Sequence, residues 1–249
     1  MAFPLLISSA KETVRIMAKP TIKTEAQRKF FHSLMILVVG VNWIGTQNLL
    51  PNHGPLLSIG FTGICLVFFV GFEFTRVRVY GYFPFRQITD RVMRPKERTR
   101  LGASVYFAVG TLLTFLSLYL LSNSLQTWLG VSCILMLTGW LAVTAVLVSA
   151  IGDGAAAIIG IKYGRRKLKG NRTLEGAIGG LIFGFLAFLP LWFFLGIHWV
   201  YGLIAASVLF LVDLTSPSIN DNLVNPVAIG FALAFFEIVV VVSTSMMVG

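Results

Sequence analysis

The chain has 249 residues, of which 56% are hydrophobic and 12% charged, and its mean hydropathy is +0.84. A soluble domain has about a quarter charged residues and cannot bury so much apolar surface in one core, so the composition excludes an ordinary soluble fold. It predicts an all-α, polytopic membrane protein. The formal net charge of +10 would suggest nucleic acid binding in a soluble protein, but all 20 Lys and Arg residues lie in three short stretches separated by apolar runs.

The first stretch of bases belongs to the segment 1–29, which we expect to be a basic cytoplasmic N-terminal tail. Its six bases are Lys11, Arg15, Lys19, Lys23, Arg28 and Lys29. The segment has no long apolar core followed by a small-residue cleavage site, which is the pattern of a cleavable signal peptide. The rest of the chain, 30–249, is predicted to form a single membrane-embedded domain.

Seven apolar segments in this domain are predicted to cross the membrane, since a helical span needs about 20 apolar residues. They cover about 31–50, 56–74, 102–122, 125–149, 176–196, 199–214 and 226–248, and the sixth is the shortest. Turns are expected at residues 51–55, at Ser122-Asn123-Ser124 and at Gly196-Ile197-His198, where polar residues, glycine or proline interrupt the apolar runs.

The two other stretches of bases follow the second and the fourth predicted spans. One contains Arg76, Arg78, Arg86, Arg91, Arg94, Lys96, Arg98 and Arg100, and the other contains Lys162, Arg165, Arg166, Lys167, Lys169 and Arg172. Cytoplasmic loops are enriched in Lys and Arg, so all three stretches are predicted to face the cytoplasm. An odd number of spans then places the C-terminus on the opposite side.

Acidic residues in or beside the spans need a specific role, because a charge is costly in hydrocarbon. Glu73, Asp153 and Asp213 lie at span ends on the predicted cytoplasmic side, whereas Glu237 lies within the last span. Glu73 and Arg76 are three residues apart and are expected to form a structural pair. For Glu237, a hydrogen bond inside the bundle and a functional role are equally open.

The densest group of polar residues is the segment 152–176. It begins with Gly152-Asp153-Gly154, which we expect to form a tight turn with accessible backbone N–H groups. Six cations then occur within eleven residues, spaced by glycines, and this pattern favours binding of a polyphosphate. Asp153 is a candidate Mg²⁺ ligand, because Mg²⁺ is often held by one or two carboxylates plus substrate phosphates. A loop that only sets orientation would explain the bases but not the embedded Asp153 and Glu175.

This segment resembles the CTP-dependent lipid kinases, the family of dolichol kinase, phytol kinase and the CTP-using diacylglycerol kinase. The matching residues are Gly152-Asp153-Gly154, Tyr163-Gly164, Lys167 and Arg172-Thr173-x-Glu175-Gly176. Further motifs agree in order: Arg28-Lys29-x-x-His32, Glu73-x-x-Arg76, Glu97 with Gly102-Ala103-x-x-Tyr106-Phe107, and Asp221-Asn222-Leu223-x-x-Pro226. Two positions depart from the family pattern. Arg172 stands where relatives have Lys, and Asp213 is the nearest acid before the Asp-Asn motif, where relatives have Glu.

The resemblance implies transfer of the γ-phosphate of CTP, with Mg²⁺, to the hydroxyl of a membrane lipid alcohol. That alcohol would be a dolichol or other polyprenol, a phytol-type prenol or a diacylglycerol. Asp153, Asp221 and His32 are the implied catalytic residues, with Asp153 and Asp221 as metal ligands and Asp221 alternatively as the base. The residues implied in nucleotide binding are Gly152, Gly154, Arg165, Arg166, Lys167, Lys169, Arg172, Thr173, Glu175, Gly176, Arg28, Lys29 and Asn222.

Two other functions stay open. A cytidylyltransferase that makes CDP-lipids would share the membrane setting and the nucleotide, but its basic-acidic signature ending in His-Gly-Gly is absent from the sequence. A transporter would carry charged residues along a path through the membrane, and here only Glu237 lies deep in a span. No nucleic acid partner is expected, because the bases are not interleaved with aromatic stacking residues outside the membrane. The sequence leaves the oligomeric state and the particular membrane open.

Overall fold

The computed structural model describes residues 29, 40, 54–79, 101–129, 134–170, 172–215 and 220–248. The first predicted span, 31–50, lies outside the described residues except for Gly40. Two predicted site residues, Arg28 and His32, also lie outside them.

The described residues form helices, and their one strand-like feature is an isolated bridge between Lys167 and Thr173. The helices are α3 (Gly54–Arg78), α5 (Ala103–Leu129), α6 (Ile134–Tyr163), α7 (Leu174–Leu195), α8 (Trp199–Thr215) and α9 (Asp221–Val248). Five of them are long and apolar enough to cross a membrane, and α8 is a shorter apolar helix. Such apolar segments are stable in hydrocarbon as helices, which satisfy their own backbone hydrogen bonds. The predicted all-α fold is confirmed for this part of the chain, and five of its helices have the length and composition that the predicted spans require.

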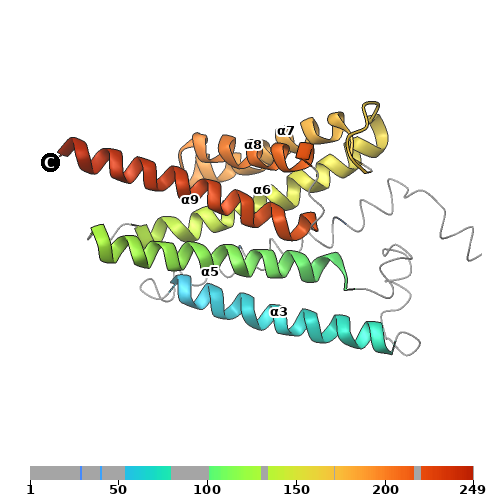
Figure 1. Ribbon diagram of the computed structural model, residues 1–249, viewed down its shortest axis with the longest axis horizontal. Helices are drawn as coiled ribbons and strands as arrows, with labels where there is room; N and C mark the ends of the chain where they lie inside the picture. Colours follow the sequence, from blue (N-terminus) through green and yellow to red (C-terminus); the bar gives the residue numbers. More distant parts are fainter. Residues whose placement is uncertain are drawn as a thin grey trace, which may run out of the picture.

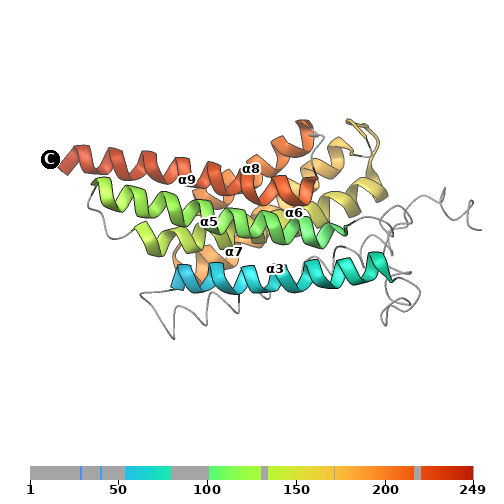
Figure 2. The same cartoon turned by 60° about the horizontal axis from the view of Figure 1, so that its bottom comes forward.

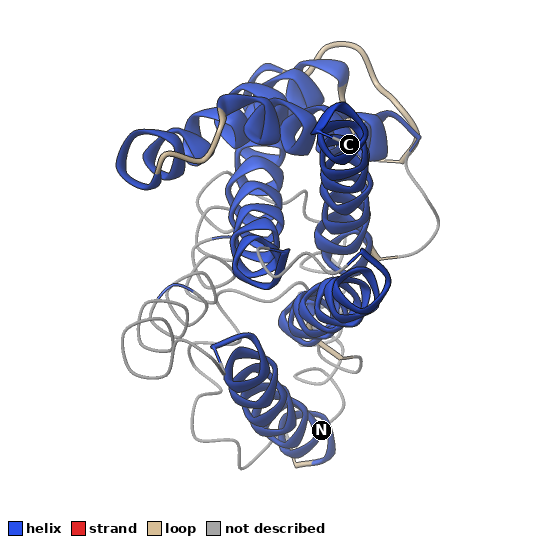
Figure 3. Cartoon of the chain, turned by 90° about the vertical axis from the view of Figure 1, so that its left-hand side faces the viewer, coloured by secondary structure: helices blue, strands red, loops and turns tan. Residues whose placement is uncertain are grey.

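The helices lie side by side, and successive helices run in opposite directions (Figure 1 and Figure 2). α5 packs against α3, α6 and α9, while α6 also packs against α7, α8 and α9. Viewed from the end of the bundle in Figure 3, α3 lies on the side opposite to α7 and α8, with which it makes no contact.

Nearly all the charged side chains that the structure describes lie at one end of the bundle, which we call the charged end. There α3, α6 and α8 finish and α5, α7 and α9 begin, on the right in Figure 1. The charged residues at this end, or within about three helical turns of it, are Lys29, Glu73, Arg76, Arg78, Asp153, Lys162, Arg165, Arg166, Lys167, Lys169, Arg172, Glu175, Asp213 and Asp221. Within the described residues, Glu237 is the one charged residue outside this group.

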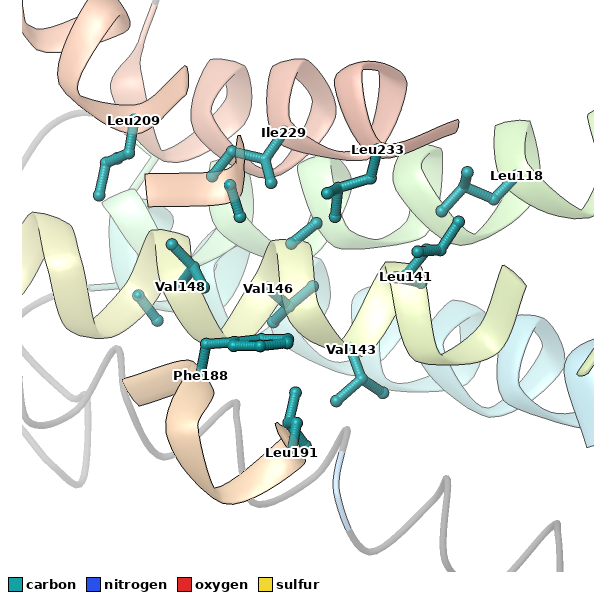
Figure 4. Packing of buried hydrophobic residues seen from close by; sticks show 14 of the residues in the cluster. Leu118, Leu141, Val143, Val146, Val148, Phe188, Leu191, Leu209, Ile229 and Leu233 are labelled. Atoms are coloured by element: carbon teal, nitrogen blue, oxygen red, sulfur yellow. The ribbon is translucent and has the colours of Figure 1, made fainter. Parts of the chain in front are cut away.

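The apolar core lies between α5, α6, α8 and α9, and α7 inserts a large side chain into it. Figure 4 shows Leu141 and Val146 of α6, Ile229 and Leu233 of α9, and Phe188 of α7, all buried in this core. The outer surfaces carry large exposed apolar side chains, as lipid-facing surfaces require.

α6 and α7 approach so closely that glycine and alanine form their contact surface. A Cβ atom on Gly152 would collide with Leu209 and lie 2.9 Å from the backbone oxygen of Gly180. A Cβ on Gly176 would lie 2.7 Å from the backbone oxygen of Ala156. Small residues permit this close approach, which is a common way to pack helices in membranes.

The predicted tight turn at Gly152-Asp153-Gly154 is therefore wrong, because all three residues lie inside α6. The glycines serve close packing, and the backbone N–H groups of an α-helix interior are used within the helix. They are not accessible to a ligand in the way that the sequence suggested. The fourth predicted span, 125–149, accordingly begins later and continues to Tyr163.

The predicted turn at Ser122-Asn123-Ser124 is also wrong, because α5 continues to Leu129. The hydroxyl of Ser124 donates to the carbonyl of Leu120 at 2.9 Å, and the hydroxyl of Thr127 donates to the carbonyl of Asn123 at 2.8 Å. Such bonding to the preceding turn lets Ser and Thr remain in a helix.

The turn at Gly196-Ile197-His198 is confirmed. Gly196 has φ +68°, the left-handed conformation that glycine adopts readily at a helix C-terminus. α9 begins five residues before the span that was predicted from residue 226. Asn220 caps it, since its side-chain oxygen accepts from the backbone N–H of Asn222 at 3.0 Å.

Candidate functional site

Three aspartates and two cations form a cluster at the charged end. We call it the ion-pair cluster, and its members are Lys29, Asp153, Arg172, Asp213 and Asp221. Lys29 forms a salt bridge with Asp153, and Arg172 forms one with Asp221. Nη1 of Arg172 also lies 3.2 Å from Oδ1 of Asp213. Asp213 interacts electrostatically with Asp153 and Lys29 as well, so the two pairs belong to one site.

Arg172 joins three helices at this site. It lies just before the start of α7, and its Nη1 donates to the backbone oxygens of Val212 at 2.9 Å and Asp213 at 3.2 Å, near the end of α8. The last carbonyls of a helix have no partner within the helix and attract a cation. The second guanidinium nitrogen reaches Asp221 at the start of α9.

The balance of charge explains how these residues are tolerated at a membrane boundary. Three carboxylates and two cations leave the cluster one negative charge in formal terms. Asp213 is buried, and an isolated charge there would be strongly unfavourable. Each of the three acids is accordingly paired with a cation.

The connection between α6 and α7 is an ordered turn of residues 164–173, which we call the basic hairpin. Lys167 pairs with Thr173 across it, and the backbone N–H of Leu168 donates to the oxygen of Arg172 at 2.8 Å. Gly170, at φ +74°, supplies the left-handed residue that the tip needs. Asn171 is the one residue of the hairpin that the structure does not describe.

Two side chains hold the hairpin against α7. Thr173 is the N-cap of α7, and its hydroxyl oxygen accepts from the backbone N–H of Gly176 at 3.1 Å. The carboxylate of Glu175 accepts from the backbone N–H groups of Arg165 at 3.0 Å and Arg166 at 3.2 Å. These two residues, predicted to bind nucleotide, thus shape the loop that carries the bases.

Four cations of the basic hairpin point outward. The side chains of Arg165, Arg166, Lys167 and Lys169 are exposed, and within the described residues none of them makes a salt bridge. Lys29 and Arg172, in contrast, are both engaged by aspartates. The basic hairpin therefore presents four solvent-accessible cations beside a cluster in which every carboxylate has a cationic partner.

The two predicted metal ligands, Asp153 and Asp221, both belong to the ion-pair cluster but are paired with different cations. Within the described part of the chain, no group of three or more His, Cys, Asp or Glu side chains is arranged to hold a metal ion. The donor set nevertheless fits Mg²⁺, which favours carboxylate oxygens and commonly completes its shell with water and substrate phosphates.

Asn222 and the predicted glycines have local roles. The Asn222 amide donates to the side-chain oxygen of Asn220 at 2.9 Å and so helps to cap α9. Gly152, Gly154 and Gly176 are buried within the helix packing described above.

Asp213 was noted from the sequence as an acid at a span end, but it was not among the predicted site residues. It is an acid at the end of an apolar helix, as Asp153 and Asp221 are at or near other helix ends. Its place became evident only from the turn that brings Arg172 against the last turn of α8. The sequence signal that could have identified Asp213 is that Asp153, Asp213 and Asp221 are all predicted to lie on the same side of the membrane.

The remaining acids in the spans have structural partners. Glu73 accepts from Nη2 of Arg76 at 2.7 Å and from the backbone N–H of Gly102 at 2.7 Å, which ties α3 to the start of α5 and confirms the predicted pair. Glu237 accepts a hydrogen bond from the hydroxyl of Tyr201. A hydrogen-bonded Glu237 was one of the two alternatives for this residue.

Comparisons of the chain with protein-family models, with curated proteins and with solved structures found no match.

Proposed function

We propose that this protein transfers the γ-phosphate of CTP to the hydroxyl of a membrane lipid alcohol. The observation that carries the proposal is the ion-pair cluster beside the unpaired cations of the basic hairpin, at one end of an apolar helix bundle. A soluble polyphosphate and a lipid-embedded hydroxyl can meet at such a boundary. The motifs that resemble the CTP-dependent lipid kinases and lie within the described residues come from the segments that form this end.

Phosphoryl transfer requires positioning and neutralisation of charge more than covalent chemistry. In the proposed reaction, Lys167, Lys169 and one of the two adjacent arginines bind the triphosphate. Phosphate oxygens then compete for Lys29 and Arg172, which frees carboxylate oxygens of Asp153 and Asp221. Asp153 would then hold Mg²⁺, which when bound would neutralise charge that develops on the phosphate oxygens, and Asp221 would take its alternative role as the base.

The charged end is proposed to face the cytoplasm. Its excess of Lys and Arg favours that side, which is also where the nucleotide is supplied. The predicted location of the C-terminus on the opposite side belongs to the same proposal, because it depends on seven spans.

The first test is an assay of the purified protein in detergent with labelled CTP, Mg²⁺, and geranylgeraniol, dolichol or dioleoylglycerol. We expect labelled lipid phosphate and CDP. Formation of CDP-lipid and pyrophosphate would replace the proposal by a cytidylyltransferase. Absence of transfer to every alcohol would contradict both enzyme functions.

The second test compares Lys167→Ala with Lys162→Ala. Loss of a charged hydrogen bond of about 1.5–3 kcal/mol should raise the KM for CTP about 10- to 100-fold in the first variant. Lys162 is exposed on the last turn of α6, outside the hairpin, and lies over the ring of Tyr163, so its removal should leave KM nearly unchanged. Equal KM values in the two variants would remove the hairpin from the nucleotide site.

A further inference from the structure

Asn225 of α9 is an anomaly in the apolar interior. The residue is 1% exposed, and neither its amide nitrogen nor its amide oxygen has a hydrogen-bond partner among the described residues. A buried polar group without a partner costs free energy of folding, on the order of 1–3 kcal/mol. Its neighbours on the same helix face, Ile229 and Leu233, are apolar core residues (Figure 4). Packing alone would therefore favour a leucine at this position.

The amide lies next to the ion-pair cluster. Asn225 follows Asp221 by four residues, so the two side chains lie on one face of α9, about one turn apart. Helical side chains lean toward the N-terminus of their helix, so the Asn225 amide is directed toward the turn that carries Asp221. The salt bridge of Asp221 with Arg172 uses Oδ1, which leaves Oδ2 able to accept a hydrogen bond.

A second buried group without a partner among the described residues lies on α5, a helix that packs against α9. The hydroxyl of Thr111 on α5 is buried and has no partner in the described part of the chain. Its neighbour Gly110 packs directly under the first turn of α9, where an added Cβ would lie 2.8 Å from the Pro226 ring. Pro226 also lacks the N–H that would otherwise pair with the backbone oxygen of Asn222.

These groups share one chemical requirement. An amide presents both a donor and an acceptor, and a hydroxyl group is the smallest ligand able to satisfy both kinds of atom. The four residues before Asn225 are half-buried, whereas Asn225 itself is buried. A charged ligand would not suit the site, because the unpaired atoms are those of neutral groups in an apolar wall.

We propose that Asn225 binds the hydroxyl of the lipid alcohol and presents it to Asp221, an inference that rests on the proposed function. The Asn225 N–H group donates to the alcohol oxygen, while the alcohol O–H donates to Oδ2 of Asp221. A lone pair of the alcohol oxygen forms the new bond to the γ-phosphorus. The bond from this phosphorus to the β–γ bridging oxygen breaks, CDP leaves with that electron pair, and the hydroxyl proton passes to Asp221.

The deciding variant is Asn225→Leu, which keeps the number and branching of the side-chain heavy atoms and has no polar atoms. Its stability should equal or exceed that of the wild type, because an unsatisfied amide is removed. Its KM for geranylgeraniol or dioleoylglycerol, whichever the wild type phosphorylates, should rise about tenfold. Its KM for CTP should not change. If Asn225 had only a structural role, Asn225→Leu would be less stable than the wild type and its KM for the alcohol would be unchanged. A lower stability or an unchanged KM would each overturn the proposal.

The matched control is Thr144→Val. Thr144 is another buried side chain without a partner in the described residues, on α6, nine residues or about 13.5 Å along the helix from Asp153. Its replacement should leave both KM values unchanged. An equal effect of Thr144→Val on the KM for the alcohol would show that the change at Asn225 is not local, and would overturn the proposal.

Binding without CTP separates this inference from the proposed function. Geranylgeraniol or dioleoylglycerol should raise the unfolding temperature of the wild type but not of Asn225→Leu, and the methyl ether of geranylgeraniol should raise neither. If that pattern is found without phosphate transfer, the hydroxyl site stands and the kinase function fails. If transfer occurs and Asn225→Leu still binds the alcohol normally, the kinase function stands and the inference fails. If neither alcohol binds the wild type, the inference also fails.

Discussion

Gly152 sets the distance between three helices because it has no side chain. It lies on α6 between Gly180 of α7 and Leu209 of α8, and it directly precedes Asp153 of the ion-pair cluster. The carboxylate can reach Lys29 at the level where the helices come together. A residue that was expected to bind a ligand through its backbone thus contributes by permitting close packing.

Gly152→Ala should lower the free energy of unfolding by about 1–3 kcal/mol, because the added methyl group must displace the backbone of α7 or the Leu209 side chain. Gly60→Ala is the matched control, since a Cβ at Gly60 meets nothing within 4 Å and alanine favours a helix. Unfolding in mixed detergent micelles measures both variants. Equal stabilities would refute the packing role.

At the scale of the element, hydrogen bonds hold the backbone of the basic hairpin, which carries four exposed basic side chains. The bridge between Lys167 and Thr173 and the two bonds to Glu175 fix its backbone. The long basic side chains can then adjust to a ligand without ordering the loop first. Pre-organisation of this kind reduces the entropic cost of binding.

Thr173→Ala removes the cap of α7 and should destabilise the protein by about 0.5–2 kcal/mol. It should also raise the KM for CTP, because the last residue of the hairpin loses its hydrogen bond to the first turn of α7. Thr127→Ala is a suitable control, as this exposed hydroxyl bonds only to the Asn123 carbonyl of its own helix. Thermal unfolding and steady-state kinetics of the two variants test the prediction. A normal KM in a destabilised Thr173→Ala protein would show that the hairpin need not be rigid.

Much of the helical framework could be predicted from the sequence, because apolar length and the position of bases are direct consequences of the bilayer. The helix ends could not be predicted as well. Ser122, Asn123 and Gly152 favour turns in water, yet all three lie inside helices here, and Gly152 lets α6 pack closely against α7 and α8. The partners of Arg172 were also beyond prediction, since they depend on how α7, α8 and α9 meet.

At the scale of the whole molecule, charge separates the two ends of the bundle. The loop at Gly196-Ile197-His198 lies at the end away from the basic hairpin, and Glu237 is paired with Tyr201 on the neighbouring helices. A protein with this asymmetry should have one orientation in its membrane.

Orientation can be tested with single cysteines at Lys169 and His198, both of which are exposed. In a background without Cys65 and Cys133, Lys169→Cys should react with a membrane-impermeant maleimide only from the cytoplasmic side. His198→Cys should react only from the other side. Labelling of both positions from one side would contradict the passage of α7 through the membrane. Labelling of each from the side opposite to that expected would contradict the proposed orientation.

Arg172 has a consequence for the order in which the protein assembles. Its recorded partners, Val212, Asp213 and Asp221, all follow it in the chain by 40 residues or more. During synthesis the guanidinium therefore reaches the membrane boundary before any of these partners exists. A nascent chain that stops before α8 exposes an unpaired cation, whereas arrival of the last two helices closes the site. All of these contacts can form only after the chain has been synthesised through Asp221.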